Sequence, residues 1–497
     1  MDAKTHFEAI PAVSRATLKE RSIRGGMATL STQVLTQCIT VASVAILARL
    51  LTPGDYGCVA MVTALTGFLH LFRELGLSGA TIQKQDISHG EVSGLFFINA
   101  AVGAFITAAT IGVAPLVAWL YGKPELMAIT VGLSFSPFFS SLGTQHAALL
   151  NRQMRFTALA SIQLTTLVAG FFAAFAIAWY GGGYWALVAN NLVSAAWGTA
   201  GLWIASSFRP RWPKKGTDVR QLLRYGVSIV GFDVAYYLRD NVGKILLGRV
   251  SGAQPLGLYD KALSLMMLPI ASLRYPLSRV AFPAMSRLAD DASMFRTYFV
   301  KYCSLLAFTS MPLIAIMYAC AGSIIRLLLG NAWVGTVEIF QILAVAGFIE
   351  TVATLRATAI LASGHGRRLV HWGLANAAVT ILGMSVGLAW GPKGVAVGYC
   401  LSTYVALHPL LIFAFHGTPL RARDFYGAIA KPAVAALAML ATYSLAVEPL
   451  VKGPDVLVLS IALPACMMTY LAVYAALPGG WSTLRDYWAY VPVLYRR

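Results

Sequence analysis

The segment Leu222–Tyr259 reads LLRYGVSIVGFDVAYYLRDNVGKILLGRVSGAQPLGLY. Most of it has the length and apolar character of a membrane-spanning helix, for which about 20 residues suffice. It nevertheless carries four ionisable side chains within its body, Asp233, Arg239, Asp240 and Lys244. Such groups are costly at membrane depth and persist mainly where they face a protein interior or a wet cavity. We therefore expect helices of this kind to surround a central cavity.

The composition extends this interpretation to the whole chain of 497 residues. Hydrophobic residues make up 58% and charged residues only 12%, whereas a soluble domain carries about 25% charged residues. The apolar runs are continuous rather than alternating, which favours helices over a closed barrel. The sequence therefore predicts an all-α polytopic membrane protein.

The excess of basic residues has a simple explanation in such a protein. The formal net charge of +18 is typical of Lys and Arg gathered in cytoplasmic loops, so no nucleic-acid partner is expected. The six cysteines are scattered singly and show no metal or redox spacing. We expect neither a bound metal nor a cofactor.

About 14 segments are candidate transmembrane helices. Their approximate limits are 27–51, 57–82, 92–120, 125–150, 156–180, 184–206, 221–248, 256–282, 296–321, 336–361, 369–390, 394–415, 426–447 and 455–477. When alternate connections are assigned to opposite sides, one side receives about 24 Lys and Arg and the other about six. This bias predicts an even number of spans with both termini in the cytoplasm.

The chain contains an internal duplication. Leu47–Gly57 resembles Leu247–Tyr259, and Tyr180–Val188 resembles Trp390–Val397. Each repeat would hold six helices, which gives two bundles of the same orientation related by an axis along the membrane normal. The predicted parts are an N-terminal bundle at 1–206, a cytoplasmic linker at 207–220, a C-terminal bundle at 221–415 and two accessory helices with a cytoplasmic tail at 416–497.

Several motifs resemble those of a known family. Ala48–Gly57 and Phe72–Ile82 are similar to the first hairpin of the Wzx-type oligosaccharide-repeat flippases, which are polysaccharide transporters of the superfamily that also includes multidrug exporters. Leu246–Arg249 with Leu256–Ala262 resembles their second-half signature. One departure concerns the Asn-x-Asp pattern of that family, because its carboxylate stands here at Asp240, about one turn early.

The resemblance implies a transporter rather than an enzyme, located in the bacterial cytoplasmic (inner) membrane. The implied substrate is an undecaprenyl-pyrophosphate-linked glycan, and the implied partners are membrane lipids and a polysaccharide polymerase or co-polymerase. Coupling to H⁺ or Na⁺ is left open. The candidate carboxylates for such coupling are Asp240, Glu350, Asp233 and Glu74, for which structural pairing is the alternative.

The basic residues within the spans are candidates for binding an anionic headgroup, because arginine can hold a pyrophosphate bidentately. By depth, Arg73, Arg274 and Arg356 form a cytoplasmic tier, and Arg239, Lys244 and Lys261 an outer tier. For three of these residues a purely structural role is the alternative to binding the headgroup. Arg73 can pair with Glu74, Lys244 can neutralise Asp240, and Lys261 can anchor a helix at the membrane interface, where Trp333 and other aromatics are expected.

Three other classes of function are weighed against a flippase. A multidrug or organic-ion exporter would need a cation-friendly cavity, which the basic excess disfavours. A membrane enzyme would need a large outer loop with catalytic residues, and no P-loop, HExxH or CxxC motif occurs in the sequence. A non-catalytic component of a polysaccharide assembly complex would leave the embedded charges without a purpose.

Overall fold

The computed structural model describes residues 33, 35–73, 77–84, 87–212, 220–451 and 453–495. Within these ranges the side chains at 77, 80, 83, 220–233, 274–280, 366–367 and 488–495 are not described. The described chain is built from helices and contains no β-strand. It forms two compact units, which we call the N-terminal unit (residues 1–237) and the C-terminal unit (residues 238–497).

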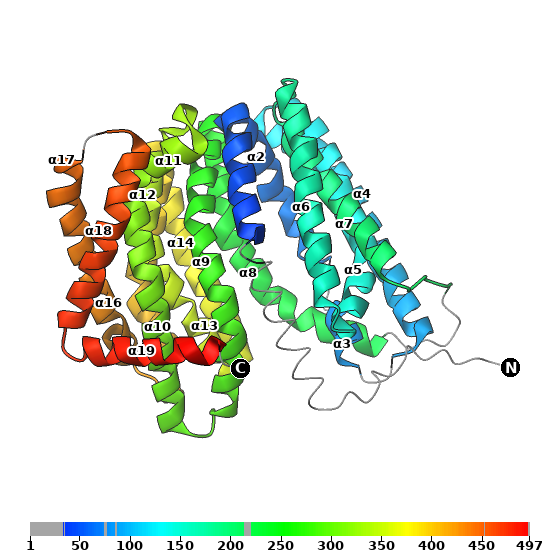
Figure 1. Ribbon diagram of the computed structural model, residues 1–497. Coiled ribbons are helices and arrows are strands. Elements are labelled where there is room, and N and C mark those ends of the chain that lie inside the picture. The colour runs from blue at the N-terminus through cyan, green and yellow to red at the C-terminus, as the bar shows by residue number, and fades with distance from the viewer. Residues whose placement is uncertain are drawn as a thin grey trace. The chain divides into compact units, whose positions relative to one another are not determined.

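The described residues of the N-terminal unit form seven helices before α8, the helix that it shares with the second unit (Figure 1). These are Leu35–Leu50, α2 (Pro53–His70), α3 (Leu77–Gln83), α4 (His89–Tyr121), α5 (Glu125–Arg152), α6 (Phe156–Trp179) and α7 (Trp185–Ala205). α4 packs along α5, α6 along α7, and α5 also contacts α7. The boundary between the units falls inside α8 (Arg220–Ser251), whereas the sequence placed a linker at 207–220; the predicted domain limits stay a prediction.

The motif Thr52-Pro53-Gly54-Asp55 sets the direction of the chain at the start of α2. Thr52 Oγ1 accepts a hydrogen bond from the Asp55 N–H at 3.2 Å, and Asp55 Oδ2 accepts one from the Thr52 N–H at 2.9 Å. Pro53 occupies the first turn, where its missing N–H is harmless. This capping box lets α2 begin at an angle of 117° to the preceding helix.

The C-terminal unit continues with helices of varied length. They are α9 (Ala253–Arg287), α10 (Ala292–Ala319), α11 (Ala321–Leu329), α12 (Thr336–Ala353), α13 (Leu355–Ala362), α14 (Gly366–Gly387), α15 (Gly391–Phe415), α16 (Ala422–Thr442), α17 (Glu448–Leu450), α18 (Asp455–Ala476) and α19 (Gly480–Tyr495). α9, α10 and α12 pack together, α14 pairs with α15, and α16 lies between α10 and α18.

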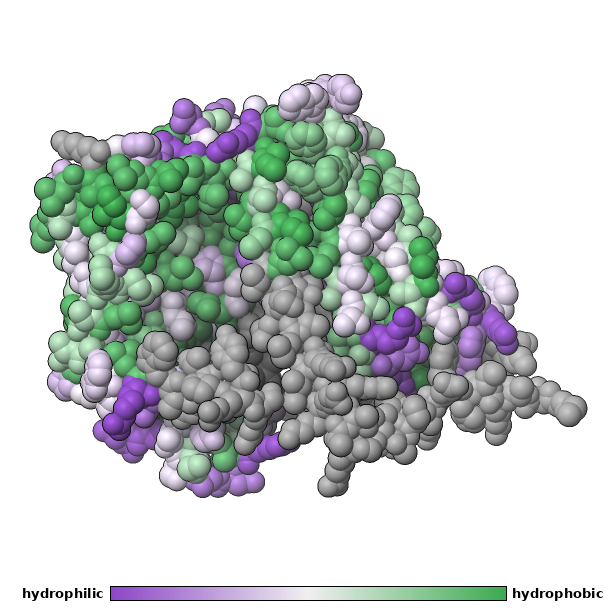
Figure 2. All heavy atoms as spheres, in the orientation of Figure 1, coloured by the Kyte–Doolittle hydropathy of each residue, from purple (hydrophilic) through white to green (hydrophobic). Residues whose placement is uncertain are grey.

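The apolar surface agrees with a multi-pass membrane protein. Nine of the described helical segments are long and apolar enough to cross a membrane, or ten if the bent pair at Thr52 counts as one span. In Figure 2 apolar side chains cover the side of the C-terminal unit, and hydrophilic ones gather toward its ends. Each of the 14 predicted ranges contains helix, and the number of actual crossings stays a prediction.

The structure departs from the predicted spans in three places. The range 57–82 is divided, because α2 ends at His70 and α3 begins at Leu77. The range 336–361 is divided at Thr354, whose carbonyl accepts the Ala357 N–H in a tighter turn. The short α19 was not predicted, because an amphipathic helix lacks a continuous apolar run; Tyr487 on it donates to Ser304 Oγ of α10 at 3.0 Å.

Candidate functional site

A buried group of charged residues lies in the C-terminal unit, where α8 meets α12 and α13. Arg239 of α8 and Arg356 of α13 are 4% and 3% exposed, and Glu350 of α12 is 9% exposed. Charged residues are almost never buried to this degree unless they are paired. We call Arg239, Asp240, Glu350 and Arg356 the arginine cluster.

Glu350 lies between the two arginines of this cluster. Arg239 Nη1 donates to Glu350 Oε1 at 3.0 Å, and Arg356 Nη2 lies 3.9 Å from Glu350 Oε2. Arg239 Nε also donates to Asp240 Oδ1 at 2.8 Å. One carboxylate therefore interacts with two guanidinium groups that come from positions 117 residues apart in the sequence.

The break between α12 and α13 fixes Arg356. Its Nε donates to the Ala353 carbonyl at 2.7 Å, an acceptor that the Ala357 N–H leaves in favour of Thr354. The Arg356 guanidinium carbon also lies 5.2 Å from the centre of the Trp372 ring of α14, within range of a cation–π interaction. Backbone, aromatic ring and carboxylate together hold this side chain in one orientation.

The predicted separation of the cations into two tiers does not hold for these two arginines. The sequence placed Arg356 in a cytoplasmic tier and Arg239 in an outer one, whereas both contact Glu350. From sequence alone, the membrane depth of each arginine is estimated from its position within its own helix. Such an estimate ignores how far one helix is shifted along its neighbour, so it does not predict that the two arginines meet. Arg239 and Arg356 are parts of a single group.

Lys244 has a different partner from the one expected. Its Nζ donates to Asp260 Oδ1 of α9 at 2.6 Å, while Asp240 interacts with Arg239. The interpretation that Lys244 neutralises Asp240 one turn away is therefore wrong. The spacing within α8 was correct, but a carboxylate on the neighbouring helix lies closer.

Lys261 and Trp333 are both buried inside the C-terminal unit. Lys261 is 7% exposed and Trp333 is fully buried. The Lys261 Nζ lies 5.6 Å from the centre of the Trp333 ring, so the ammonium group is placed on an aromatic face. Both side chains therefore face the protein interior and each other, whereas the depth of the pair in the membrane stays a prediction.

The other predicted residues fall outside this group. Arg73 lies in the N-terminal unit, half-buried, with its N–H bonded to the His70 carbonyl at 3.1 Å just beyond the end of α2. Glu74 and the side chains of Asp233 and Arg274 lie outside the described residues. Among the described residues, no group of three or more His, Cys, Asp or Glu could hold a metal ion.

The electrostatic balance of the site is close to neutral. Arg239, Arg356, Lys244 and Lys261 bring four positive charges, and Asp240, Glu350 and Asp260 bring three negative ones. Sequence reasoning missed the roles of Asp260, Trp333 and Trp372, although Asp260 stands in the motif Leu256–Ala262. An anion bound between Arg239 and Arg356 would compete with Glu350 for the same guanidinium groups.

Comparison with known proteins now identifies the family. The family model described as polysaccharide biosynthesis protein matches residues 46–338. The chain belongs to this polysaccharide biosynthesis family. The matched segment includes Arg239, Lys244 and Lys261, and it ends before Glu350 and Arg356.

Two relatives are similar over most of their length. The chain is 23% identical over 338 residues to the lipopolysaccharide biosynthesis protein WzxC of Escherichia coli (strain K12), covering 68% of this chain and 69% of WzxC. It is 24% identical over 400 residues to the succinoglycan biosynthesis transport protein ExoT of Rhizobium meliloti (strain 1021), covering 80% and 81%.

The fold of this chain is similar to that of a solved structure. The lipid II flippase MurJ, in an inward closed conformation, matches with a TM-score of 0.69 at 13% identity, over 91% of this chain and 98% of MurJ. At this identity the likeness concerns the fold alone. The resemblance to Wzx-type proteins is confirmed by the family match and by these relatives.

Proposed function

We propose that this protein is a flippase that moves undecaprenyl-pyrophosphate-linked oligosaccharide repeat units from the cytoplasmic to the periplasmic leaflet of the bacterial inner membrane. The product would feed the assembly of an exopolysaccharide, O-antigen or capsule. Membership of the polysaccharide biosynthesis family carries this proposal. It is supported by the names of WzxC and ExoT and by a fold shared with a lipid flippase.

In this proposal the arginine cluster receives the pyrophosphate group. A guanidinium group binds phosphate oxygens bidentately, and Arg239 and Arg356 already converge on one carboxylate. The carboxylate of Glu350 therefore stands where an anionic headgroup would bind. Substrate binding would displace Glu350 from the two arginines.

The displacement of Glu350 suggests how transport could be coupled. A buried carboxylate that loses its partners is favoured in its neutral form, so binding of the headgroup would be linked to uptake of a proton. Asp240, Asp233 and Glu74 are the further coupling candidates, with Na⁺ as the alternative ion. No organic cofactor enters this scheme.

The membrane potential can contribute as well. An anion that leaves a negative interior gains about 2.3 kcal/mol per charge for each 100 mV that it crosses. The rocking of two bundles in alternating access would expose the cluster first to one side and then to the other. The lipid tail would stay in the bilayer during this movement.

Deletion of the gene in its own host tests the proposal. A flippase predicts that the surface polysaccharide is lost and that lipid-linked repeat units accumulate in the cytoplasmic leaflet. Complementation with the parent or with Arg326→Ala should restore the polysaccharide, whereas Arg356→Ala should not. Arg326 is the matched control because it lies in an exposed pair with Asp455.

Two other outcomes would reject the proposal. Normal polysaccharide with raised sensitivity to cationic drugs would indicate a multidrug exporter. Loss of polysaccharide that both arginine variants restore equally, without accumulation of lipid-linked units, would indicate a structural component of the assembly complex with the polymerase.

A further inference from the structure

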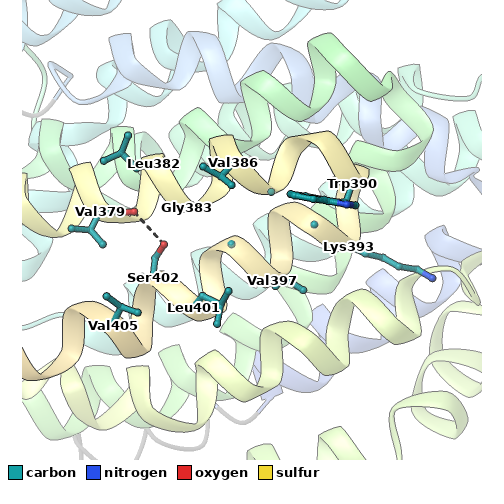
Figure 3. Close-up of a pocket in the computed structure, with 13 residues that line it drawn as sticks. Val379, Leu382, Gly383, Val386, Trp390, Lys393, Val397, Leu401, Ser402 and Val405 are labelled. Carbon is teal, nitrogen blue, oxygen red and sulfur yellow. Dashed lines mark hydrogen bonds between the residues drawn. The ribbon is translucent and has the colours of Figure 1, made fainter.

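An apolar groove runs along α14 and α15 on the surface of the C-terminal unit (Figure 3). It has a cavity volume of about 740 Å³, within the range of ligand sites. Its walls are Val and Leu side chains from both helices. Ser402 Oγ donates to the Val379 carbonyl at 3.1 Å, so that hydroxyl needs no ligand.

Glycine residues make the floor of the groove. A Cβ atom added to Gly387 would lie 2.1 Å from the Gly394 carbonyl oxygen, and one added to Gly383 would lie 2.6 Å from the Gly398 carbonyl oxygen. The two backbones are therefore in direct contact along this line, as small residues allow between membrane helices. Among the described residues, the side chain closest to this line is the short one of Ser402, whose Oγ would lie 1.9 Å from a Cβ added to Gly383, and a furrow is left.

The walls of the groove are exposed although they are strongly apolar. Leu382, Val386, Leu401 and Val405 are 66%, 68%, 60% and 69% exposed. They belong to the segment Arg368–Phe415, which is long and apolar enough to cross a membrane. Exposed apolar patches mark sites of contact with a membrane or a partner, and on a segment of membrane-spanning length a hydrocarbon chain fits this surface.

One end of the groove is polar. Lys393 and Trp390 lie together at that end in Figure 3, and a cation beside an indole is typical of the membrane–water interface. Lys393 pairs with Glu338, and the two side chains are 57% and 64% exposed. An exposed pair is weak, so a lipid phosphate can replace Glu338 at little cost.

The length of the groove selects the kind of chain. From Lys393 to Val405 α15 rises about 18 Å at 1.5 Å per residue. One leaflet contributes about half of the roughly 30 Å hydrocarbon core. The groove therefore matches a single chain that extends through one leaflet from the interface to the midplane.

We propose that this groove is a binding site for an acyl chain of an anionic phospholipid, with the phosphate at Lys393 and the chain over the glycine floor. The site is separate from the arginine cluster. It does not depend on the proposed transport function.

Photo-crosslinking tests this site in the full-length protein in phosphatidylcholine liposomes. The probe is phosphatidylglycerol with a diazirine in one acyl chain, and labelled residues are mapped by mass spectrometry. We expect labels concentrated in residues 379–405. Val397→Trp, which fills the groove, should abolish this labelling, whereas Ile412→Trp on the exposed face of the same helix should leave it unchanged.

A second pair of variants tests the headgroup. One Lys near the membrane surface contributes about 1 kcal/mol toward an anionic lipid, so Lys393→Gln should lower the labelling about fivefold. Lys123→Gln is the matched control, because Lys123 also pairs with a glutamate near a helix end. Unlabelled phosphatidylglycerol should compete, and added phosphatidylcholine should not.

Other results would overturn the proposal. Even labelling of all apolar exposed helices, unaffected by Val397→Trp, would mean that the groove is ordinary lipid-facing surface. Stronger competition by undecaprenyl phosphate than by phosphatidylglycerol would assign it to a prenyl lipid. If Lys393→Gln and Lys123→Gln lowered the labelling equally, Lys393 would not bind the lipid phosphate.

Discussion

Glu350 is the carboxylate that contacts both arginines of the arginine cluster. Two buried guanidinium groups meet its carboxylate, at 3.0 Å and 3.9 Å. Removing one member of a buried ion pair leaves an uncompensated charge, which usually costs about 3–5 kcal/mol. A polar residue in this position therefore has a structural role in addition to any role in transport.

The first prediction concerns this carboxylate. Glu350→Ala should lower the unfolding free energy in detergent by about 3–5 kcal/mol, measured by thermal or denaturant unfolding. Asp455→Ala, which breaks the exposed pair with Arg326, should cost less than about 1 kcal/mol. Similar losses in both variants would mean that Arg239 and Arg356 do not depend on Glu350.

The second prediction concerns the partner of Lys244. Because Lys244 Nζ contacts Asp260, the exchange Lys244→Asp with Asp260→Lys should recover most of the stability that either single change loses. The exchange Lys244→Asp with Asp240→Lys should recover none. Thermal unfolding of the three single and two double variants distinguishes the two pairings, and recovery only with Asp240 would contradict the structure.

At the scale of helices, the contact between α14 and α15 depends on glycine. Gly398 has the Gly383 carbonyl oxygen only 2.1 Å from the position of an added Cβ. Helices approach this closely in membranes only where a small residue leaves the backbone uncovered. The same contact forms the floor of the lipid groove. The glycines between α14 and α15 therefore produce both the close packing of the two helices and the groove.

The third prediction follows from that contact. Gly398→Ala should destabilise the protein, because the new methyl group meets a carbonyl oxygen. Gly427→Ala on α16 should stabilise it by about 0.5–1 kcal/mol, since nothing lies within 4 Å and alanine favours helix. The opposite signs can be read from unfolding temperatures, and a shift of the same sign in both would refute this account.

Much of the helical architecture could be predicted from sequence. Continuous apolar runs identify α4, α10 and α18, because a helix in a bilayer needs little more than length and apolarity. The break at Thr354 and the surface helix α19 were not predictable in this way. The break depends on a local turn of the backbone. Helix α19 is amphipathic, so it has no continuous apolar run that would identify it.

The candidate site could be predicted only in part. Embedded charges point to a buried group, and Arg239, Glu350 and Arg356 were found for that reason. Their pairing could not be found, because the contact between Arg239 and Glu350 joins positions 111 residues apart. The contact of Lys261 with Trp333 could not be found either, because the two residues are 72 positions apart in the sequence.

For the whole molecule, the distribution of basic residues predicts its orientation. The fourth prediction is that both termini and residues 362–368 are cytoplasmic, while residues 391–393 lie on the outer side. Fusions ending at these positions should give cytoplasmic fluorescent-protein signal for the first set and outer alkaline phosphatase activity for the second. The reversed result at any of them would mean that a span has been counted wrongly.

The most direct test of the central claim is lipid movement by the purified protein in liposomes. A fluorescent undecaprenyl-pyrophosphate-linked oligosaccharide should change leaflets with the parent and with Arg326→Ala. Loss of a charged hydrogen bond of about 1.5–3 kcal/mol predicts at least about a tenfold lower rate for folded Arg356→Ala. No movement with the parent, or an unchanged rate in Arg356→Ala, would contradict the account.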